Sequence, residues 1–325
     1  MTISSTVRTL VRRFVPLADI SFIVPVALAA WLLRGVRRIG IHRLPATRRT
    51  LLRVGIFPLR NHYYDPQFDH RVSRQPLTAE RPLPGIDWNI DNQLQQLAAF
   101  IFAGELTDLP HKPTGTLEFH LDNDAFVAGD AEYWYQLLRA TKPRRIFEIG
   151  SGHSTRMAIR ALARNRAEDT GYHCRHVCIE PYEMPWLEQT GVEVVRNNVE
   201  TLDVAFFSEL EAGDILFIDS SHIIRPQGDV LFEYLEILPT LRPGVIVHVH
   251  DIFSPRNYLE SWLLEGVKFW NEQYLLEAFL THNNNWKIIG ALNWLHHNHF
   301  DALKRVAPNL LPESEPGSFY LQRVS

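Results

Sequence analysis

The central part of the chain alternates short apolar runs with longer segments of helical periodicity. Five such runs cover residues 146–149, 176–179, 192–195, 214–218 and 244–250. Apolar runs of this length, separated by helical segments, are typical of parallel strands that are buried on both faces. The pattern predicts an α/β domain with a doubly wound sheet, and residues 286–292 and 318–324 are the candidates for two further strands.

The first run leads into a glycine turn with an acidic residue beside it. Glu148 precedes Gly150 and Gly152, and Ser154 can cap the helix that follows. A dinucleotide fingerprint needs a third glycine at position 155, where this chain has threonine. Because the Glu148 carboxylate would also repel a phosphate, the turn favours a nucleoside ligand that carries a positive charge.

Polar residues follow every one of these runs, as the carboxyl ends of parallel strands require for a ligand site. An acidic residue after the second strand can accept both hydroxyls of a ribose. The residues concerned are Glu180, Asn198, Asp219, His222, His250 and Asp251. All strand ends of this kind meet at one edge of a sheet, so the pattern predicts a single cleft.

These motifs resemble those of class I S-adenosylmethionine-dependent methyltransferases. Residues 148–155 resemble the first motif, residues 178–182 the acidic second motif, and residues 213–222 and 242–251 the strand ends of sugar, glycan and catechol-type O-methyltransferases. The resemblance implies a Rossmann-like sheet of seven strands whose last strand is antiparallel, and S-adenosylmethionine as cofactor. The implied cofactor contacts are Glu148, Gly150, Ser151, Gly152, Ser154, Glu180, Asn198 and Asp219.

Methyl transfer to a hydroxyl requires alignment of donor and acceptor and removal of a proton. His222 is the expected general base, with Asp219 and His250 as further catalytic residues, because an unperturbed histidine titrates near ~6.5. Asp219, Asp251 and His250 are expected to bind Mg²⁺ or another divalent cation. Two alternatives stay open: His222 caps a helix, or Asp219 orients a ligand without metal. The related families usually place Asp or Asn where this chain has Ile252.

The first 53 residues contain ten arginines against one aspartate, which leaves 23 basic and 36 acidic residues in the rest. Residues 20–33 are nearly all apolar, but as a helix they reach only about 21 Å, short of a ~30 Å hydrocarbon core. We therefore expect a helix that lies on an anionic membrane surface. A core-packing helix or a dimer contact is the alternative. A secretory signal and nucleic-acid binding fit the surrounding arginines less well.

Three segments follow from these patterns: a membrane-proximal segment at 1–53, a proline- and aromatic-rich arm at 54–125, and a methyltransferase domain at 126–325. Residues 258–282 carry one long amphipathic pattern. The predicted function is methylation of a hydroxyl on a saccharide or lipid-linked glycan, at the cytoplasmic face of a membrane, with homo-oligomerisation left open. A non-catalytic nucleoside- or glycan-binding module and a nicotinamide-dependent oxidoreductase are the alternatives.

Overall fold

The structure is a computed structural model that describes residues 5–60, 62, 64–115, 117–182 and 184–325. It divides into two compact units, Met1–Ser73 and Arg74–Ser325. The division falls inside the proline-rich stretch that the sequence predicts as an arm. The predicted segment boundaries near residues 53 and 125 stay predictions.

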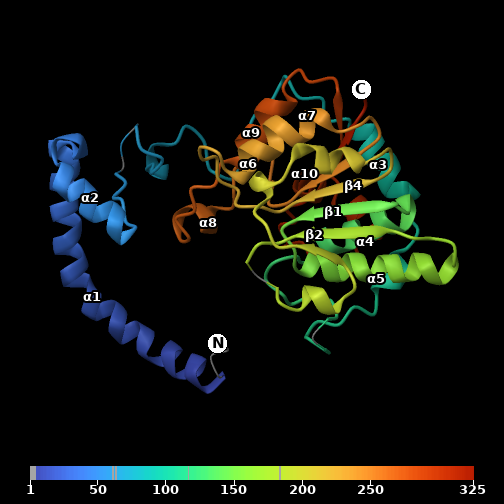
Figure 1. Cartoon of the computed structure of the whole chain (residues 1–325), viewed down its shortest axis with the longest axis horizontal. Coiled ribbons are helices and arrows are strands. Elements are labelled where there is room, and N and C mark those ends of the chain that lie inside the picture. The colour runs from blue at the N-terminus through green and yellow to red at the C-terminus, as the bar shows by residue number, and fades with distance from the viewer. Residues whose placement is uncertain (1–4, 61, 63, 116, 183) are drawn as a thin grey trace. The chain divides into compact units, whose positions relative to one another are not determined.

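The N-terminal unit is built on two helices, α1 (Ser5–Ile39) and α2 (Pro45–Val54), drawn in blue in Figure 1. Within α1, the stretch Ala18–Ile39 has a mean hydropathy of 1.6, and none of it is buried. Its 22 residues would reach about 33 Å, enough to cross a bilayer by length and composition. This apolar stretch of α1 is thus longer than the 14-residue run at 20–33, from which we predicted a helix too short to cross a bilayer.

The second unit holds a seven-stranded sheet in the order β3-β2-β1-β4-β5-β7-β6. The strands are β1 (Arg145–Ile149), β2 (Arg175–Ile179), β3 (Glu193–Val195), β4 (Ile215–Ile218), β5 (Ile246–Val249), β6 (Trp286–Ala291) and β7 (Phe319–Arg323). The pairs among β1 to β5 are parallel, whereas β7 is antiparallel to both β5 and β6. The predicted Rossmann-like α/β sheet is confirmed.

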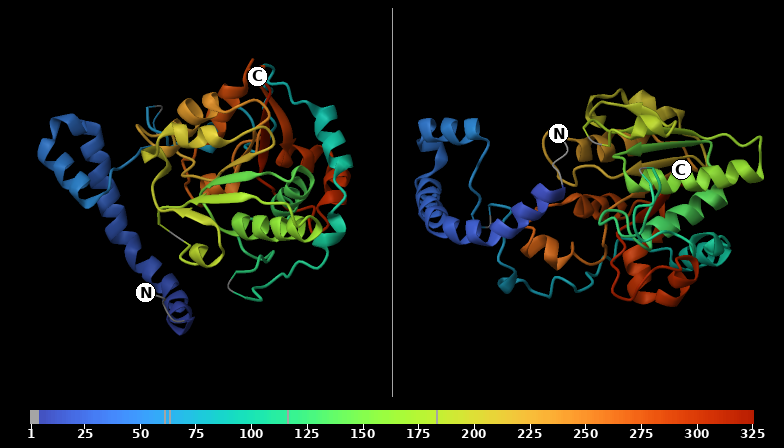
Figure 2. Two further views of the ribbon diagram at one scale, coloured as in Figure 1. Left: turned by 45° about the vertical axis from the view of Figure 1, so that its right-hand side comes forward. Right: turned by 90° about the horizontal axis from the view of Figure 1, so that it is seen from below.

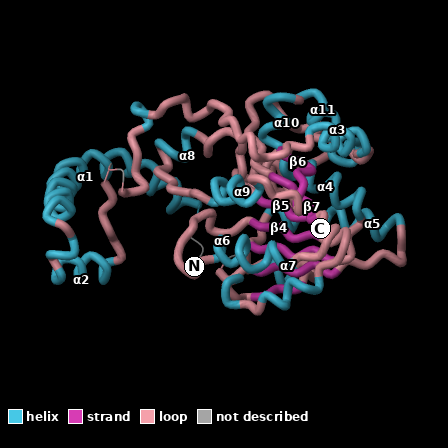
Figure 3. The backbone as a smooth tube through the Cα atoms, turned by 90° about the horizontal axis from the view of Figure 1, so that it is seen from above, coloured by secondary structure: helices cyan, strands magenta, loops and turns pink. Residues whose placement is uncertain are grey.

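Helices cover both faces of the sheet (Figures 2 and 3). On one side lie α3 (Ile90–Ala99), α4 (Asp130–Thr141), α5 (His153–Glu168), α10 (Leu292–Asn298) and α11 (Phe300–Val306). On the other lie α6 (Asp229–Phe232), the π-helical turn Glu233–Ile237, α7 (Leu238–Thr240) and α9 (Glu272–Leu280). Successive strand residues alternate between the two cores, so Phe217 packs with the first group and Leu216 with the second.

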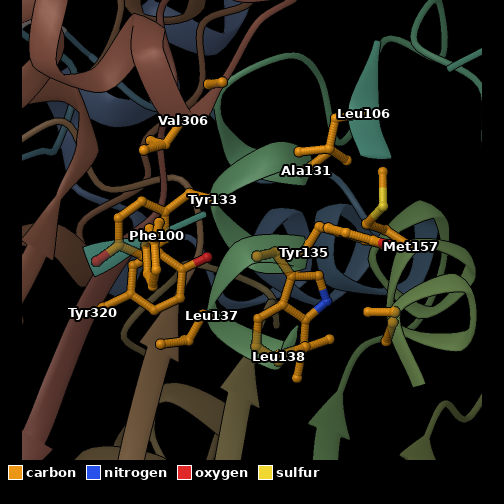
Figure 4. Packing of buried hydrophobic residues seen from close by; sticks show 14 of the residues in the cluster. Phe100, Leu106, Ala131, Tyr133, Tyr135, Leu137, Leu138, Met157, Val306 and Tyr320 are labelled. Atoms are coloured by element: carbon orange, nitrogen blue, oxygen red, sulfur yellow. The ribbon is translucent and has the colours of Figure 1, made fainter. Parts of the chain in front are cut away.

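Aromatic side chains fill the first of these cores (Figure 4). Tyr133 of α4 lies against Tyr320 of β7, with ring centroids 4.6 Å apart. Its hydroxyl donates a hydrogen bond to the Ile289 carbonyl oxygen over 2.9 Å. A buried tyrosine needs such a partner, since an unpaired hydroxyl in an apolar core is costly. These contacts fix α4 against β6 and β7.

The amphipathic pattern at 258–282 does not form one helix. It forms α8 (Glu260–Leu264) and α9, which are separated by the turn around Gly266 and Val267. Val267 adopts a φ of 49°, which a helix cannot contain. The break matters for the site because it places the first residue of α9, Glu272, next to the end of β4.

Candidate active site

The ends of β1 and β4 meet at Gly150, immediately beyond the first strand. Gly150 adopts a φ of 78°, and a Cβ atom there would lie 2.1 Å from the Asp219 carbonyl oxygen. Its amide donates to Ile179, and the Asp219 amide donates to Ile149. Only glycine fits this junction, because any side chain would collide with backbone that cannot give way. The turn therefore brings the chain close to whatever occupies the strand ends.

A cavity of about 270 Å³ opens at this junction. Residues 149–150, 179–182, 198–200 and 219–221 line it, together with Arg225 and Asp229. Four of the predicted cofactor residues are among them: Gly150, Glu180, Asn198 and Asp219. The lining holds four carboxylates against one guanidinium, so it suits a cationic nucleoside better than a phosphate.

Glu180 is held in place by backbone amides. Its carboxylate accepts hydrogen bonds from the Ser151 amide at 3.3 Å and the Tyr182 amide at 3.0 Å. The side chain is thus fixed in the cavity wall at the end of β2, where a ribose would meet an acceptor of two hydrogen bonds. Ser151 is not part of the cavity lining, and its amide contacts the lining residue Glu180. Ser154 is buried, and its carbonyl oxygen accepts a hydrogen bond from the Trp134 indole at 3.2 Å.

Glu148 is fully buried behind the cavity rather than in its lining. One carboxylate oxygen lies 2.7 Å from His176 Nε2 and accepts from Cys178 Sγ at 3.4 Å. Burial raises the pKa of the Cys178 thiol well above its usual value. Glu148 therefore contacts β2 directly, and its predicted contact with the cofactor stays a prediction. Gly152, on the same turn, has an extended φ of 172° and lies near Met184.

The second group of predicted residues converges at the ends of β4 and β5. His222 Nε2 lies 3.3 Å from Asp219 Oδ1 and 3.5 Å from Asp251 Oδ2. His250 Nδ1 lies 3.5 Å from Asp219 and 3.6 Å from Asp251. The structure thus places all four residues in contact, beside the cavity that Asp219 lines.

Glu272 is a site residue that the sequence did not reveal. It is fully buried, and its carboxylate lies 2.8 Å from His222 Nδ1 while accepting from the Tyr234 hydroxyl at 3.1 Å. Because Glu272 accepts the Nδ1 proton, His222 turns Nε2 toward Asp219 and Asp251. The only sequence signal was a glutamate inside an amphipathic run, where a surface position is the usual expectation.

Two of these residues adopt a strained backbone conformation. His222 has a φ of 60° and Asp251 a φ of 57°, in the left-handed region that residues with a side chain rarely enter. The His222 carbonyl oxygen accepts hydrogen bonds from the Asn271 and Glu272 amides, at 3.0 and 3.2 Å, so the start of α9 holds it there. Strain of about 1–3 kcal/mol per residue persists where it positions functional groups.

The carboxylates set the charge of both histidines. Burial opposes protonation of His222, but its hydrogen bonds to Asp219 and Glu272 outweigh burial and raise the pKa to about 10. For His250 burial is likewise outweighed, by Asp251 and Asp219, and the pKa rises well above its usual value. Burial raises the pKa of Asp251, whereas the charge of His250, against the opposing effect of burial, keeps the pKa of Asp219 low.

A further buried carboxylate orients His250. Its Nε2 lies 3.8 Å from Asp130 Oδ2, and Asp130 accepts from the amides of Gly317 and Ser318 at 3.1 and 2.7 Å. Asp130 begins α4, so the helix that packs on the sheet also reaches the site. Like Glu272, it was missed because a carboxylate at a helix start is ordinarily explained by the helix dipole.

The donor set fits a divalent cation. Among the described residues, Asp219, His222 and Asp251 each offer one ligand atom, and these atoms lie within 4.8 Å of one another. Glu272 behind His222 is the carboxylate that a metal-binding histidine commonly needs on its other nitrogen. Two carboxylate oxygens and one imidazole nitrogen suit ions such as Mn²⁺ or Zn²⁺ at least as well as Mg²⁺. His250, predicted as a ligand, lies beside this set.

A second cavity, of about 280 Å³, lies beyond β5. It is lined by Phe253, the segment 256–261, Asn293 and Glu315, with Leu77 and Thr78 from the arm. The lining mixes polar side chains with apolar ones, among them Phe253, Leu259 and the Tyr258 ring. Asp219 lines the first cavity, and Asp251 follows β5 shortly before the segment that lines the second.

Comparisons with known proteins agree with this geometry. Residues 147–252 match the model of a family described as a methyltransferase domain. An uncharacterised protein of Archaeoglobus fulgidus is 26% identical over 174 residues, which cover 48% of this chain and 74% of that protein.

Several solved structures are also similar. An O-methyltransferase of Streptomyces achromogenes involved in tomaymycin synthesis, in complex with S-adenosylmethionine, is 15% identical with a TM-score of 0.37, over 71% of this chain and 90% of that chain. A TDP-rhamnose 3'-O-methyltransferase of calicheamicin biosynthesis is 14% identical with a TM-score of 0.38, over 73% and 95%. An O-methyltransferase of Bacillus cereus is 15% identical with a TM-score of 0.36, over 72% and 91%.

The glycine turn, the acidic end of β2 and the antiparallel last strand all agree with the family that the sequence motifs resemble. The matching region, residues 147–252, contains the cofactor cavity and the ends of β4 and β5. Residues 147–252 therefore form a methyltransferase domain, and they carry the motifs that resemble those of class I S-adenosylmethionine-dependent enzymes.

Proposed function

We propose that the protein transfers a methyl group from S-adenosylmethionine to a hydroxyl of a saccharide or a lipid-linked glycan. The observation that carries the proposal is the convergence of Asp219, His222, His250 and Asp251 beside the cofactor cavity. Methyl transfer is an in-line displacement at the sulfonium carbon, so an acceptor must lie on the far side of that carbon from the sulfur. The strand ends with these four residues are where the acceptor oxygen would be held.

Within this proposal His222 accepts the hydroxyl proton at Nε2, and Glu272 stabilises the imidazolium that results. The pKa of about 10 means that Nε2 already carries a proton at neutral pH. His222 therefore acts as a base only when the charge of its carboxylate neighbours is compensated. A divalent cation held by the Asp219 and Asp251 carboxylates alone would supply that compensation and lower the pKa of a bound hydroxyl. His222 Nε2 cannot bind the cation and accept the proton at once, so its role as base requires that it is not a ligand in that state.

The cavity beyond β5 is the proposed acceptor site. Its lining includes the Asn257 and Asn293 amides and the Glu315 carboxylate beside apolar side chains, and Tyr258 adds an aromatic ring. Amide and carboxylate groups suit the many hydroxyls of a sugar, and a ring suits its apolar face. Asn257 and Glu260 both line this cavity, at positions that nothing in the sequence distinguishes from ordinary surface residues.

Cytoplasmic location at the inner face of a membrane is part of the same proposal. It is supported by the exposed apolar length of α1 and by the arginines on either side of it. A membrane-attached enzyme would meet an acceptor that is itself linked to a lipid.

Substitution of the base and its neighbour tests the catalytic roles. We expect His222→Ala and Asp219→Ala to lower methyl transfer to glycan acceptors by about 10²-fold or more, the usual contribution of general acid–base catalysis. Arg225→Ala changes a cavity residue outside the carboxylate cluster and is the matched comparison. Unchanged transfer in both His222→Ala and Asp219→Ala would refute the assigned roles.

Metal dependence has its own test. Activity in excess chelator should fall to background and return with added Mn²⁺ or Mg²⁺, and calorimetry should detect cation binding that Asp251→Asn weakens. Full activity in chelator would remove the cation from the mechanism without affecting the assignment of the cofactor cavity.

A further inference from the structure

A cluster of arginines surrounds a hollow at the end of α1, within the N-terminal unit. The hollow measures about 640 Å³, and its basic lining residues are Arg34, Arg37, Arg38, Arg60 and His62. The remaining lining consists of apolar residues of α1 and the segment 58–59, with Gln67. We call it the arginine hollow. No carboxylate belongs to its lining among the residues that the structure describes, so its charge favours an anion.

The arginines of the hollow are held in position rather than free in solvent. Asp65, whose side chain is 8% exposed, pairs with Arg37 at 2.6 Å and with Arg60 at 3.3 Å. Arg37 also lies over the Phe57 ring, 5.1 Å from its centroid. Its Nε atom is buried and, among the described residues, has no hydrogen-bond partner. A buried donor without an acceptor costs free energy, so this atom points to a ligand that accepts a hydrogen bond.

The apolar part of α1 determines where the hollow would lie in a bilayer. Residues 22–24 and 26–32 are apolar at consecutive positions, so every face of the helix is apolar there, and their side chains are exposed. A helix that lies in the interface needs one polar face, whereas a helix that is apolar on all faces is immersed in hydrocarbon. Arg34, Arg37 and Arg38 follow the apolar run by about 2–8 Å along the helix axis. This is the level of the lipid headgroups.

We propose that the arginine hollow binds the phosphate of an anionic phospholipid while the apolar part of α1 lies in the hydrocarbon core. The lipid phosphate accepts hydrogen bonds from Arg37 and Arg60, whose forked guanidinium groups match phosphate oxygens. Exposed Arg34 and Arg38 add attraction to the charged surface. The proposal refines the membrane association proposed above and requires neither the methyl acceptor nor the methyl donor.

The test measures lipid retention by the full chain in micelles of a neutral detergent, using native mass spectrometry. Phosphatidylglycerol is compared with phosphatidylcholine at equal concentration. We expect preferential retention of phosphatidylglycerol, and Arg37→Gln with Arg60→Gln should weaken retention at least tenfold, a change of about 1.4 kcal/mol. Arg48→Gln with Arg49→Gln, two exposed positions on α2 outside the hollow, is the control with the same loss of charge.

Several results would overturn the proposal. Equal retention of both lipids, or equal weakening in the α2 control, would show that no specific site exists. Displacement of phosphatidylglycerol by inorganic phosphate at similar concentration would assign the hollow to a free anion instead. Arg37→Lys with Arg60→Lys keeps the charge and loses the forked geometry, so its retention should lie between those of wild type and the glutamine variant. Circular dichroism separates binding from folding: weak retention in a glutamine variant that keeps the helical signal supports the site, whereas weak retention only in preparations that have lost that signal removes it. Methyl transfer assayed on the same wild-type preparation tests the proposed function separately.

Discussion

At the residue scale, the pKa of His222 decides when the proposed base can act. Its pKa of about 10 is raised by Asp219 and Glu272, so the imidazole is charged below that pH and neutral only above it. In Glu272→Gln the amide keeps a hydrogen-bond acceptor but loses the charge. We expect the acid limb of the pH–rate profile, recorded at one fixed concentration of Mg²⁺, to move to lower pH.

Glu236→Gln is the comparison, because Glu236 is exposed and its loss removes the same charge. An acid limb that stays in place in Glu272→Gln, or that moves equally in both variants, would show that Glu272 does not govern the titration. A shift to higher pH would contradict the sign of the argument, since loss of a neighbouring carboxylate can only favour the neutral imidazole.

Gly150 is the residue for which the sequence and the structure agree most closely. The glycine turn predicted a close backbone approach, and the structure shows the Asp219 carbonyl oxygen 2.1 Å from where a Cβ would be. We expect Gly150→Ala to lower the free energy of unfolding by roughly 2–4 kcal/mol and to weaken cofactor binding. Urea unfolding measures the first effect. Gly104→Ala, where a Cβ would meet nothing within 4 Å, should change stability by less than about 1 kcal/mol.

At the scale of elements, the strands could be predicted and the start of α9 could not. A parallel strand that is buried on both faces can be recognised in a sequence by its consecutive apolar residues. The predicted strand ends also carry the residues that the structure brings together. Glu272 and Asp130 lack such a signal, because each sits at a helix start where a carboxylate is common. Their role depends on where a helix begins relative to a distant strand, and neither periodicity nor local propensity encodes that relation.

The helix α9 also secures the segment that leaves β5. Gln273 is fully buried, accepts from the Phe253 amide at 2.7 Å and donates to the Arg256 carbonyl oxygen at 2.8 Å. Gln273→Leu would leave the Phe253 amide unpaired and remove one of the two hydrogen bonds to the Arg256 carbonyl oxygen, which also accepts from Arg81 at 2.8 Å. We therefore expect a loss of roughly 1–3 kcal/mol in the free energy of unfolding. Gln95→Leu, at an exposed position of α3, is the matched control. Equal unfolding curves for the two variants would show that the segment finds other partners.

At the scale of the whole molecule, the two units differ in how much buried core stabilises them. Residues 74–325 hold both hydrophobic cores, whereas the described residues of α1 and α2 include none that is buried. Local unfolding follows buried contacts, so the two units should lose structure separately. The sequence predicted this asymmetry only through composition: an arginine-rich, apolar start against an acidic remainder.

Because the two units should unfold separately, cofactor binding should shift only the unfolding transition of the unit that binds the cofactor. A ligand that binds only the folded protein stabilises it by about 2.7 kcal/mol at a hundredfold excess over its Kd. In calorimetry of the full chain in neutral detergent, S-adenosylmethionine should therefore raise the midpoint of the main transition, which belongs to the unit that contains Glu180 and Asp219. NAD should leave that midpoint unchanged, because its pyrophosphate would face carboxylates at the glycine turn. Glu180→Gln should reduce the shift, since a neutral amide accepts ribose hydrogen bonds more weakly than a carboxylate. A midpoint raised by NAD and not by S-adenosylmethionine would overturn the assignment of the cavity.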